Sequence, residues 1–401
     1  MIASDKELPT GSLALRAISK SFPGVRAVDN VSLDFYPGKI HALMGENGAG
    51  KSTVMKLITG IYQPDSGEMS FNGKRLAPRS YRESLAMGID IVHQEIQVVP
   101  DASVAENIML DKLSLVSTGG LVNWRRLYEE ASAFMQEVGL DLPPSTVVRQ
   151  LSAAHKQLIQ IARALAARAT VILLDEPTSS LSLNEADNLF KLLDGLKKRD
   201  VTLIYVSHKI EEVYRIADTI SVMRDGKLIG TRTSAELERR ELVRMMIGRD
   251  LREQRIGPSE VNERRIVLKV EALTKARKCR AISFELHEGE ILGFYGLVGS
   301  GRTEFARVLI GEDQADSGSV YVNGKKAAIN RVSDALFRYK IGYVTENRKE
   351  EGLFLDDSVL TNLTLLVWNK MRHPLTRAIS RHRLHVFLHG FRPTYARYGR
   401  Q

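Results

Sequence analysis

The residues best suited to chemistry form one glycine-rich stretch near the N-terminus. Its members are Gly45, Glu46, Asn47, Gly48, Ala49, Gly50, Lys51, Ser52 and Thr53. The stretch fits G-x-x-x-x-G-K-[ST], the P-loop motif, in which backbone N–H groups cradle phosphates, the lysine reaches the terminal phosphates and the hydroxyl holds Mg²⁺. Apolar runs at 40–44 and 54–58 predict a strand that feeds the loop and a helix that leaves it. We therefore expect a nucleoside triphosphate to bind with Mg²⁺.

Two adjacent carboxylates follow the apolar run 170–174. An aspartate at a strand end beside a P-loop is suited to hold Mg²⁺, so we assign Asp175 to the metal together with the Ser52 hydroxyl. A second carboxylate directly after it is suited to polarise the attacking water, so we assign Glu176 as the general base. The alternative, a solvated acidic turn, is disfavoured by the P-loop in the same chain.

Three further polar residues are candidates for the site. His208 follows the run 201–206 and is suited to bond the γ-phosphate and orient water, although a lone histidine is more often structural. The amide of Gln94 is suited to reach metal and water, although such a glutamine is more often a surface residue. Ser152 is predicted to cap a helix, and a capped helix is its simpler interpretation. His208, like Asp175 and Glu176, follows a predicted strand, and the catalytic groups of parallel sheets lie at the carboxyl ends of the strands.

An internal repeat organises the chain. Residues 28–74 align with residues 279–325, so that Gly45 matches Gly296. In both copies, short alternating strands with Asn-Gly turns predict an antiparallel layer beside an α/β core. Two copies of one domain are therefore expected.

The remainder of the first copy predicts helices around a parallel sheet. Residues 104–138 and 151–167 have a mainly helical pattern, while 170–174 and 201–206 are short β-rich runs expected to be buried strands. The charged stretch 250–265 contains Gly-Pro-Ser and predicts an exposed linker.

Composition predicts a globular chain of two or three domains, since 43% of its 401 residues are hydrophobic and 26% are charged. No apolar run of about 18 residues occurs, so no membrane span is expected. The charged start of the chain does not resemble a signal peptide. The single cysteine, Cys279, excludes an internal disulfide and favours a cytosolic location.

The net charge of +9 lies almost wholly in one segment. Residues 358–401 contain eight basic and no acidic side chains, which leaves +1 for residues 1–357. The basic signal, which would otherwise suggest a nucleic-acid partner, therefore belongs to a tail.

The first copy is similar to the nucleotide-binding domains of ABC transporters. The resemblance rests on the order and spacing of Phe22, the P-loop, Gln94, the helix start at Ser152, Asp175 to Thr178, and His208. It covers residues 14 to about 250. It implies an α/β P-loop NTPase fold with an antiparallel β layer and a helical subdomain, here in tandem with an incomplete second copy.

The resemblance also implies roles for these residues. Phe22 would stack on adenine, Gln94 would be the Q-loop glutamine that reaches the metal, residues 152–157 the signature motif and His208 the switch histidine. The family holds ATP between the P-loop of one domain and the signature of another. A second nucleotide-binding domain is therefore expected in trans, with the helix start at Ser152 as part of its anion site.

A narrower resemblance is to the tandem ATPases of bacterial importers for ribose, galactose, allose and related sugars. It rests on the tandem layout, the loosened signature at 153–155, and the segments 180–182 and 246–249. In the second copy Arg302 replaces the P-loop lysine and Glu346 the Q-loop glutamine. The second site is therefore expected to bind or hydrolyse nucleotide poorly.

By that resemblance the partners are integral-membrane permease subunits near Gln94 and, indirectly, a periplasmic sugar-binding protein. The expected place is the cytoplasmic face of the inner membrane, as a peripheral subunit, and no nucleic-acid partner is expected. The expected domains are residues 1–249, a linker at 250–265, an incomplete domain at 266–370 and a basic tail at 371–401.

The chain also departs from the family pattern. No second signature or Walker B string follows Asp357, and the last thirty residues hold four histidines, seven arginines and no acids. We interpret these thirty residues as a tail unrelated to the sugar-importer family, such as read-through after a frameshift. The alternative is a genuine basic tail that binds anionic lipid or nucleic acid.

Three functions remain open at this point. The first is the ATPase of a monosaccharide importer, impaired by the missing signature. The second is a non-transport tandem ATPase acting on ribosomes or nucleic acid, which a short linker and a loose signature disfavour. The third is a remnant that binds ATP without turnover.

Overall fold

The structure is a computed structural model, and it describes residues 9–94, 97–118, 121–179, 181–248, 265–276, 278–296, 299–345 and 351–368. The chain divides into two compact units, Met1–Gly257 and Pro258–Gln401. All of the predicted linker except Arg265, and the whole predicted tail, lie outside the described residues.

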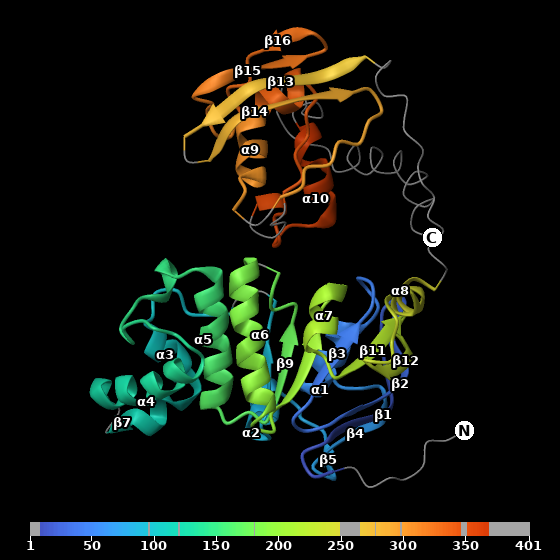
Figure 1. Ribbon diagram of the computed structural model, residues 1–401, viewed down its shortest axis with the longest axis vertical. Helices are drawn as coiled ribbons and strands as arrows, with labels where there is room; N and C mark the ends of the chain where they lie inside the picture. The colour runs from blue at the N-terminus through green and yellow to red at the C-terminus, as the bar shows by residue number, and fades with distance from the viewer. Residues whose placement is uncertain are drawn as a thin grey trace, which may run out of the picture. The chain divides into compact units, whose positions relative to one another are not determined.

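Unit 1 is an α/β structure of a six-stranded sheet, a four-stranded sheet, a small two-stranded hairpin and a layer of helices (Figure 1). Its strands are β1 (Leu13–Phe22), β2 (Val25–Phe35), β3 (Ile40–Met44), β4 (Ser66–Phe71), β5 (Lys74–Leu76), β6 (Ile89–Val92), β7 (Ser117–Thr118), β8 (Leu121–Val122), β9 (Val171–Asp175), β10 (Thr202–Val206), β11 (Thr219–Arg224) and β12 (Lys227–Thr233). Its α-helices are α1 (Lys51–Ile58), α2 (Tyr81–Ala86), α3 (Val104–Ile108), α4 (Trp124–Glu137), α5 (Ala153–Ala166), α6 (Leu183–Lys197), α7 (Ile210–Ile216) and α8 (Arg239–Ile247).

The central sheet has the order β12-β11-β3-β10-β9-β6, with β12 antiparallel and the other pairs parallel. Both of its faces are buried. Along β9, Ile172 and Leu174 pack into one apolar cluster, whereas Val171 and Leu173 pack into the other. A strand covered on both faces is apolar at nearly every position, which is why the predicted runs at 40–44, 170–174 and 201–206 are confirmed as β3, β9 and β10. His41 of β3 and Thr202 of β10 are polar exceptions that are also buried.

The second sheet is antiparallel, with the order β2-β1-β4-β5, which confirms the predicted antiparallel layer. Helix α1 contributes Val54, Met55 and Leu57 to the same apolar cluster as the inner face of this sheet. The turn between β4 and β5 is made by Asn72 and Gly73 at φ 52° and 71°. Positive φ at both positions gives the tight hairpin that an Asn-Gly pair favours.

The helical layer differs from the prediction in one place. Residues 104–138 contain the helices α3 and α4, but the segment between them forms a 3₁₀ turn over Leu110–Val116 and the small hairpin of β7 and β8. Helix α5 begins where predicted, because the Ser152 hydroxyl accepts a hydrogen bond from the backbone of His155. Helix α5 packs against α3, α4 and β6.

Unit 2 repeats the antiparallel part of unit 1. Its elements are β13 (Ile266–Lys275), β14 (Cys279–His287), α9 (Arg302–Leu309), β15 (Ser317–Val322), β16 (Lys325–Ala327) and α10 (Val359–Thr364). The sheet order β14-β13-β15-β16 matches β2-β1-β4-β5.

The apolar run 291–295 of unit 2, which corresponds to β3, is not a strand. In unit 1, β3 is paired on one side with β10 and on the other with β11. No strand of unit 2 within the described ranges pairs with residues 291–295, and Ile291 and Tyr295 are 98% and 99% exposed. Without neighbouring strands, an apolar sequence alone does not form a parallel sheet.

Across the part of the chain that the structure describes, no helix is both long enough and apolar enough to cross a membrane.

Candidate functional site

The P-loop joins the carboxyl end of β3 to the start of α1. Gly50 precedes α1 at φ 101°, and a Cβ atom there would lie 2.3 Å from the carbonyl oxygen of Ala27. Only glycine fits this position without a clash. Lys51 is 6% exposed, and its ammonium donates hydrogen bonds to the carbonyl oxygens of Gly45 at 2.8 Å and Glu46 at 3.0 Å.

Burial lowers the pKa of Lys51, and the carboxylates of Glu176 and Asp175 oppose that shift. The lysine therefore lies within electrostatic reach of both carboxylates predicted for the site. Burial and the neighbouring Glu176 together raise the pKa of Asp175, while His93, Lys51 and Ser52 act in the opposite direction.

The Ser52 hydroxyl lies 3.4 Å from Oδ2 of Asp175. Hydroxyl and carboxylate oxygens are ligands that Mg²⁺ accepts, and it usually takes one or two carboxylates from the protein. The two adjacent carboxylates Asp175 and Glu176 repel each other, so a divalent cation would relieve their repulsion. These residues therefore fit the predicted metal.

Glu176 is the residue on which the predicted catalytic set converges. Its carboxylate accepts a hydrogen bond from Nε2 of Gln94 at 3.3 Å and lies 2.8 Å from Nδ1 of His208. Its backbone has φ 46°, outside strand geometry, and its N–H donates to the carbonyl of Val206 at 2.9 Å.

Two predicted residues lie outside this cluster. The Phe22 ring packs edge to face on Tyr62, with ring centroids 5.1 Å apart, and the ammonium of Lys20 lies 5.8 Å from its centroid. The Ser152 hydroxyl contacts the His155 ring at 3.2 Å, at the start of its own helix. Roles for Phe22 on adenine and for Ser152 in trans remain predictions.

The P-loop counterpart in unit 2 keeps the turn and the positive charge, but an arginine replaces the lysine. Gly301, at φ 88°, precedes α9 as Gly50 precedes α1, and Arg302 occupies the position of Lys51. Arg302 is exposed, whereas Lys51 is buried. Residues 297–298 of this loop and Glu346 lie outside the described residues.

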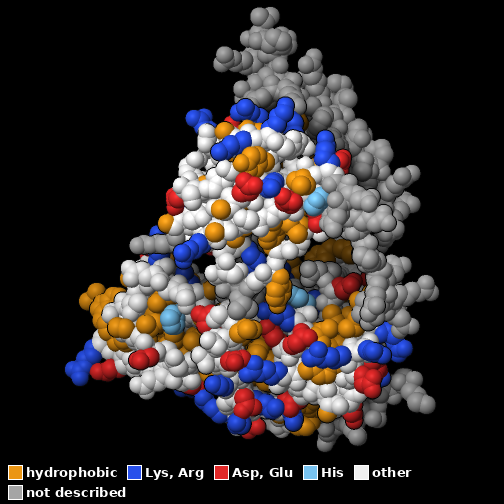
Figure 2. Space-filling model, turned by 45° about the horizontal axis from the view of Figure 1, so that its top comes forward, with side chains coloured by type: hydrophobic (Ala, Val, Ile, Leu, Met, Phe, Trp, Pro, Cys, Tyr) orange, Lys and Arg blue, Asp and Glu red, His pale blue; other side chains and the backbone are white. Residues whose placement is uncertain are grey.

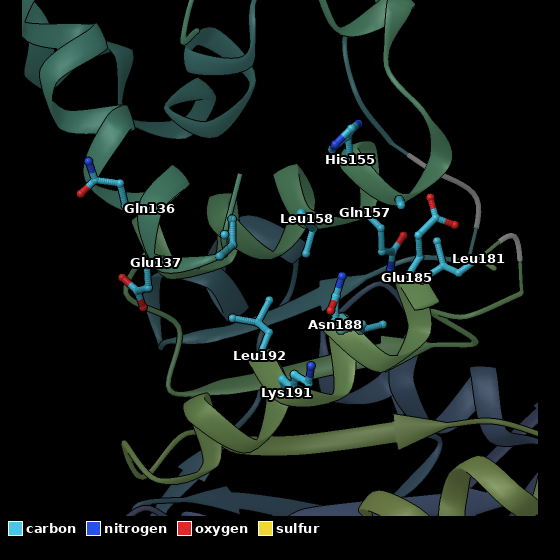
Figure 3. Close-up of a pocket in the computed structure, with 14 residues that line it drawn as sticks. Gln136, Glu137, His155, Gln157, Leu158, Leu181, Glu185, Asn188, Lys191 and Leu192 are labelled. Carbon is cyan, nitrogen blue, oxygen red and sulfur yellow. The ribbon is translucent and has the colours of Figure 1, made fainter. Parts of the chain in front are cut away.

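A separate cleft of about 500 Å³ lies between α4, α5 and α6 (Figure 3). Figure 3 shows Leu158 extending from α5 toward Leu192 of α6. Gln157 lines this cleft and is 4% exposed, and within the described ranges its Nε2 atom has no hydrogen-bond partner. No residue of the P-loop or of the Asp175–Glu176 pair lines it, so it is distinct from the candidate site.

A contact between Thr178 and Glu212 that supports the site was not predicted, although Thr178 lies in the motif Asp175 to Thr178. Thr178 and Glu212 are joined by a hydrogen bond of 2.7 Å between the turn after β9 and helix α7. Their separation in sequence leaves no motif to reveal this contact. Two acidic residues in the first turn of α7, Glu211 and Glu212, suggest only a favourable helix start.

The ABC transporter family matches residues 28–179 and 279–395. Both copies match the same family, which confirms that the sequence repeat is a repeat of one domain type.

The chain is also similar to several curated proteins. It is 42% identical to a protein of Halalkalibacterium halodurans with the provisional name ribose/galactose/methyl galactoside import ATP-binding protein, over 86% of this chain and 66% of that protein. It is 42% identical to a ribose import ATP-binding protein of Rubrobacter xylanophilus, over 88% and 70%, and 40% identical to one of Clostridium perfringens, over 89% and 71%. The chain thus spans about two thirds of the length of these relatives.

Among solved structures, an ATP-binding cassette of an ABC transporter is similar at a TM-score of 0.54 and 26% identity. The match covers 60% of this chain and 100% of that cassette.

Proposed function

Since the chain belongs to the ABC transporter family, we propose that it is the ATP-binding and ATP-hydrolysing subunit of an importer for a monosaccharide such as ribose or galactose. The names of the similar proteins, all of which refer to sugar import, support transport over a ribosomal or nucleic-acid role. We further propose residues 1–249 as one nucleotide-binding domain and 266–370 as part of a second.

The convergence of Gln94 and His208 on the Glu176 carboxylate carries this proposal. A carboxylate that turns away from its strand, between an amide and an imidazole, is arranged to accept a proton from water and to keep that water in place. Asp175 is the neighbouring carboxylate, but it faces the Ser52 hydroxyl instead. The two carboxylates therefore have different tasks.

In the proposed reaction the P-loop backbone and Lys51 bind the phosphates of ATP. Asp175, Ser52 and the Gln94 amide would hold Mg²⁺, which when bound would supply positive charge to the phosphates. Glu176 accepts the proton of the attacking water, and His208 fixes the orientation of that carboxylate. Phe22 offers an aromatic ring for the adenine base.

Two further parts of the site are proposed to come from other chains or domains. The helix start at Ser152 faces the nucleotide of a second nucleotide-binding domain, as a capped helix N-terminus suits an anion. Permease subunits contact the helical layer, and a periplasmic sugar-binding protein acts through them. The subunit then lies at the cytoplasmic face of the membrane.

An exposed apolar area supports a partner on the helical layer. Figure 2 shows hydrophobic side chains gathered at the end of unit 1 that carries α4. Leu110, Leu121 and Trp124 in this region are 39%, 78% and 49% exposed. Grouped apolar side chains on a surface commonly mark a protein interface.

The substitution Glu176→Gln tests the proposed catalytic role. It removes the proton acceptor and retains the shape, so turnover of Mg-ATP should fall by about 10²- to 10⁴-fold. The affinity for ATP, measured by titration calorimetry, should stay at the wild-type level because Lys51 and the P-loop backbone are unchanged. Glu211→Gln is the matched control, since that side chain is 74% exposed and pairs with Arg239. Equal turnover in Glu176→Gln and wild type would refute the assignment.

A further inference from the structure

We infer that Glu212 is a positioning residue for the catalytic pair Glu176 and His208, an inference that rests on the proposed ATPase function. Its carboxylate accepts from three donors, one in the turn after β9, one in β10 and one at the N-cap of its own helix, α7. Oε2 accepts hydrogen bonds from the hydroxyls of Thr178 at 2.7 Å and Tyr205 at 2.9 Å, and Oε1 lies 2.9 Å from the ammonium of Lys209.

These donors flank both catalytic residues. Thr178 belongs to the turn that follows Glu176, while Tyr205 and Lys209 lie on either side of His208. The Lys209 ammonium closes the network, because it also donates to the carbonyl and hydroxyl oxygens of Thr178, both at 3.2 Å. One carboxylate therefore connects the turn that carries the base to the chain that carries its histidine partner.

Burial makes this connection rigid. Thr178 and Tyr205 are 1% and 0% exposed, and the Glu212 side chain is 15% exposed. Burial, with the Glu212 carboxylate as the second cause, raises the pKa of the Tyr205 phenol, so the phenol remains a donor. Buried polar groups whose partner is removed incur a desolvation penalty, so the network favours a single arrangement.

The distance between Glu176 and His208 is the quantity that this network sets. Oε1 of Glu176 lies 2.8 Å from Nδ1 of His208, and the His208 side chain is 54% exposed, so packing alone does not fix the ring. Without Glu212, the turn after β9 and the segment before α7 lose one of the links between them and keep only the Lys209 contacts with Thr178 and the backbone hydrogen bond from Glu176 to Val206. A displacement of about 1 Å between reacting groups is enough to lower a rate by about 10²-fold.

The test compares Glu212→Ala with Glu211→Ala in the full chain. Glu211 is the adjacent glutamate on the same helix, but its partner is Arg239 at the surface. Glu212→Ala should lower kcat for Mg-ATP by about 10- to 100-fold with KM unchanged, and Glu211→Ala should leave both unchanged. Glu212→Gln, whose amide oxygen can still accept from Thr178 and Tyr205, should recover part of the rate.

A double-mutant cycle separates positioning from general damage. If Glu212 acts through Glu176, then Glu212→Ala should add no further loss in the Glu176→Gln background. An equal loss in both backgrounds would overturn the inference.

A second measurement does not depend on turnover. The imidazole resonances of His208, identified among nine histidines by their loss in His208→Gln, should shift in Glu212→Ala as they do in Glu176→Gln, and remain unchanged in Glu211→Ala. A chain without turnover would refute the proposed function, while the His208 signal would still decide the role of Glu212. Unshifted His208 resonances in a folded Glu212→Ala variant would refute that role.

Discussion

His41, buried in the middle of the P-loop strand β3, makes the stability of unit 1 sensitive to pH. It is 3% exposed, and its Nε2 atom accepts a hydrogen bond from the backbone N–H of Tyr36 at 2.7 Å. Its Nδ1 lies 2.7 Å from the hydroxyl of Thr219 in β11. Nε2 also lies 3.2 Å from the carbonyl oxygen of Tyr36, a contact that favours a protonated ring, whereas the hydrogen bond from the Tyr36 N–H requires an unprotonated Nε2. Burial lowers the pKa of His41 from 6.5 to about 4, against smaller opposing effects of Tyr36 and Asp218.

Acid should destabilise the folded state, because the unfolded chain binds a proton at His41 more readily than the folded chain does. Between pH 6.5 and 4 the unfolded chain binds a proton at His41 and the folded chain does not, so acid favours unfolding. The contribution is fully present above pH 6.5 and is lost as the pH falls toward 4. It amounts to about 2 kcal/mol lost at pH 5 and about 3 kcal/mol below pH 4.

The measurement is urea unfolding of the full chain at pH 7.5 and pH 5.0, followed by the fluorescence of Trp124 in unit 1. Trp368→Phe removes the only other tryptophan. His41→Gln serves as the comparison, because glutamine offers an acceptor and does not titrate. Wild type should lose about 2 kcal/mol more than His41→Gln between the two pH values. Equal losses would refute the reasoning.

Three further outcomes are expected. Lys51→Ala should weaken ATP binding by about 10- to 100-fold in titration calorimetry, since it removes a charged hydrogen-bond donor to phosphate; an unchanged affinity would contradict the P-loop assignment. Leu173 is fully buried in β9, so Leu173→Ala should lower the free energy of urea unfolding of unit 1 by about 2–5 kcal/mol; a smaller loss would mean that the apolar core around Leu173 is less tightly packed than the structure shows. Ser152→Ala should cost about 1 kcal/mol through the lost helix cap while leaving ATP affinity intact; weaker ATP binding would place Ser152 in the same pocket as the P-loop.

The sequence predicted the elements whose pattern is dictated by local chemistry. The strand at 40–44 followed from a run of apolar residues, and the helix cap at Ser152 from a side chain that can accept a hydrogen bond. The Asn72-Gly73 hairpin followed from two residue types that tolerate positive φ. The hairpin of β7 and β8 was missed because its strands have two residues each, too few for any periodicity.

Within the site, the motif residues were predicted but the supports were not. Asp175, Glu176 and His208 end recognisable strands, so the edge at which they meet followed from sheet topology. The contact of Glu212 with Thr178 spans 34 positions and joins a helix to a turn. Such a contact depends on the tertiary arrangement of α7 and the turn after β9, which no local pattern encodes.

The position of β3 also constrains how a nascent chain acquires its nucleotide pocket. Residues 40–44 leave the ribosome early, yet their two strand partners, β10 and β11, lie at 202–206 and 219–224. Until translation has passed β10 both edges of the strand that feeds the P-loop are open, and one stays open until β11 has been made; closing such distant pairs is slow. During synthesis, the early chain therefore exposes an apolar strand that is open to misassociation, and a chaperone that binds this segment would protect it until the sheet closes.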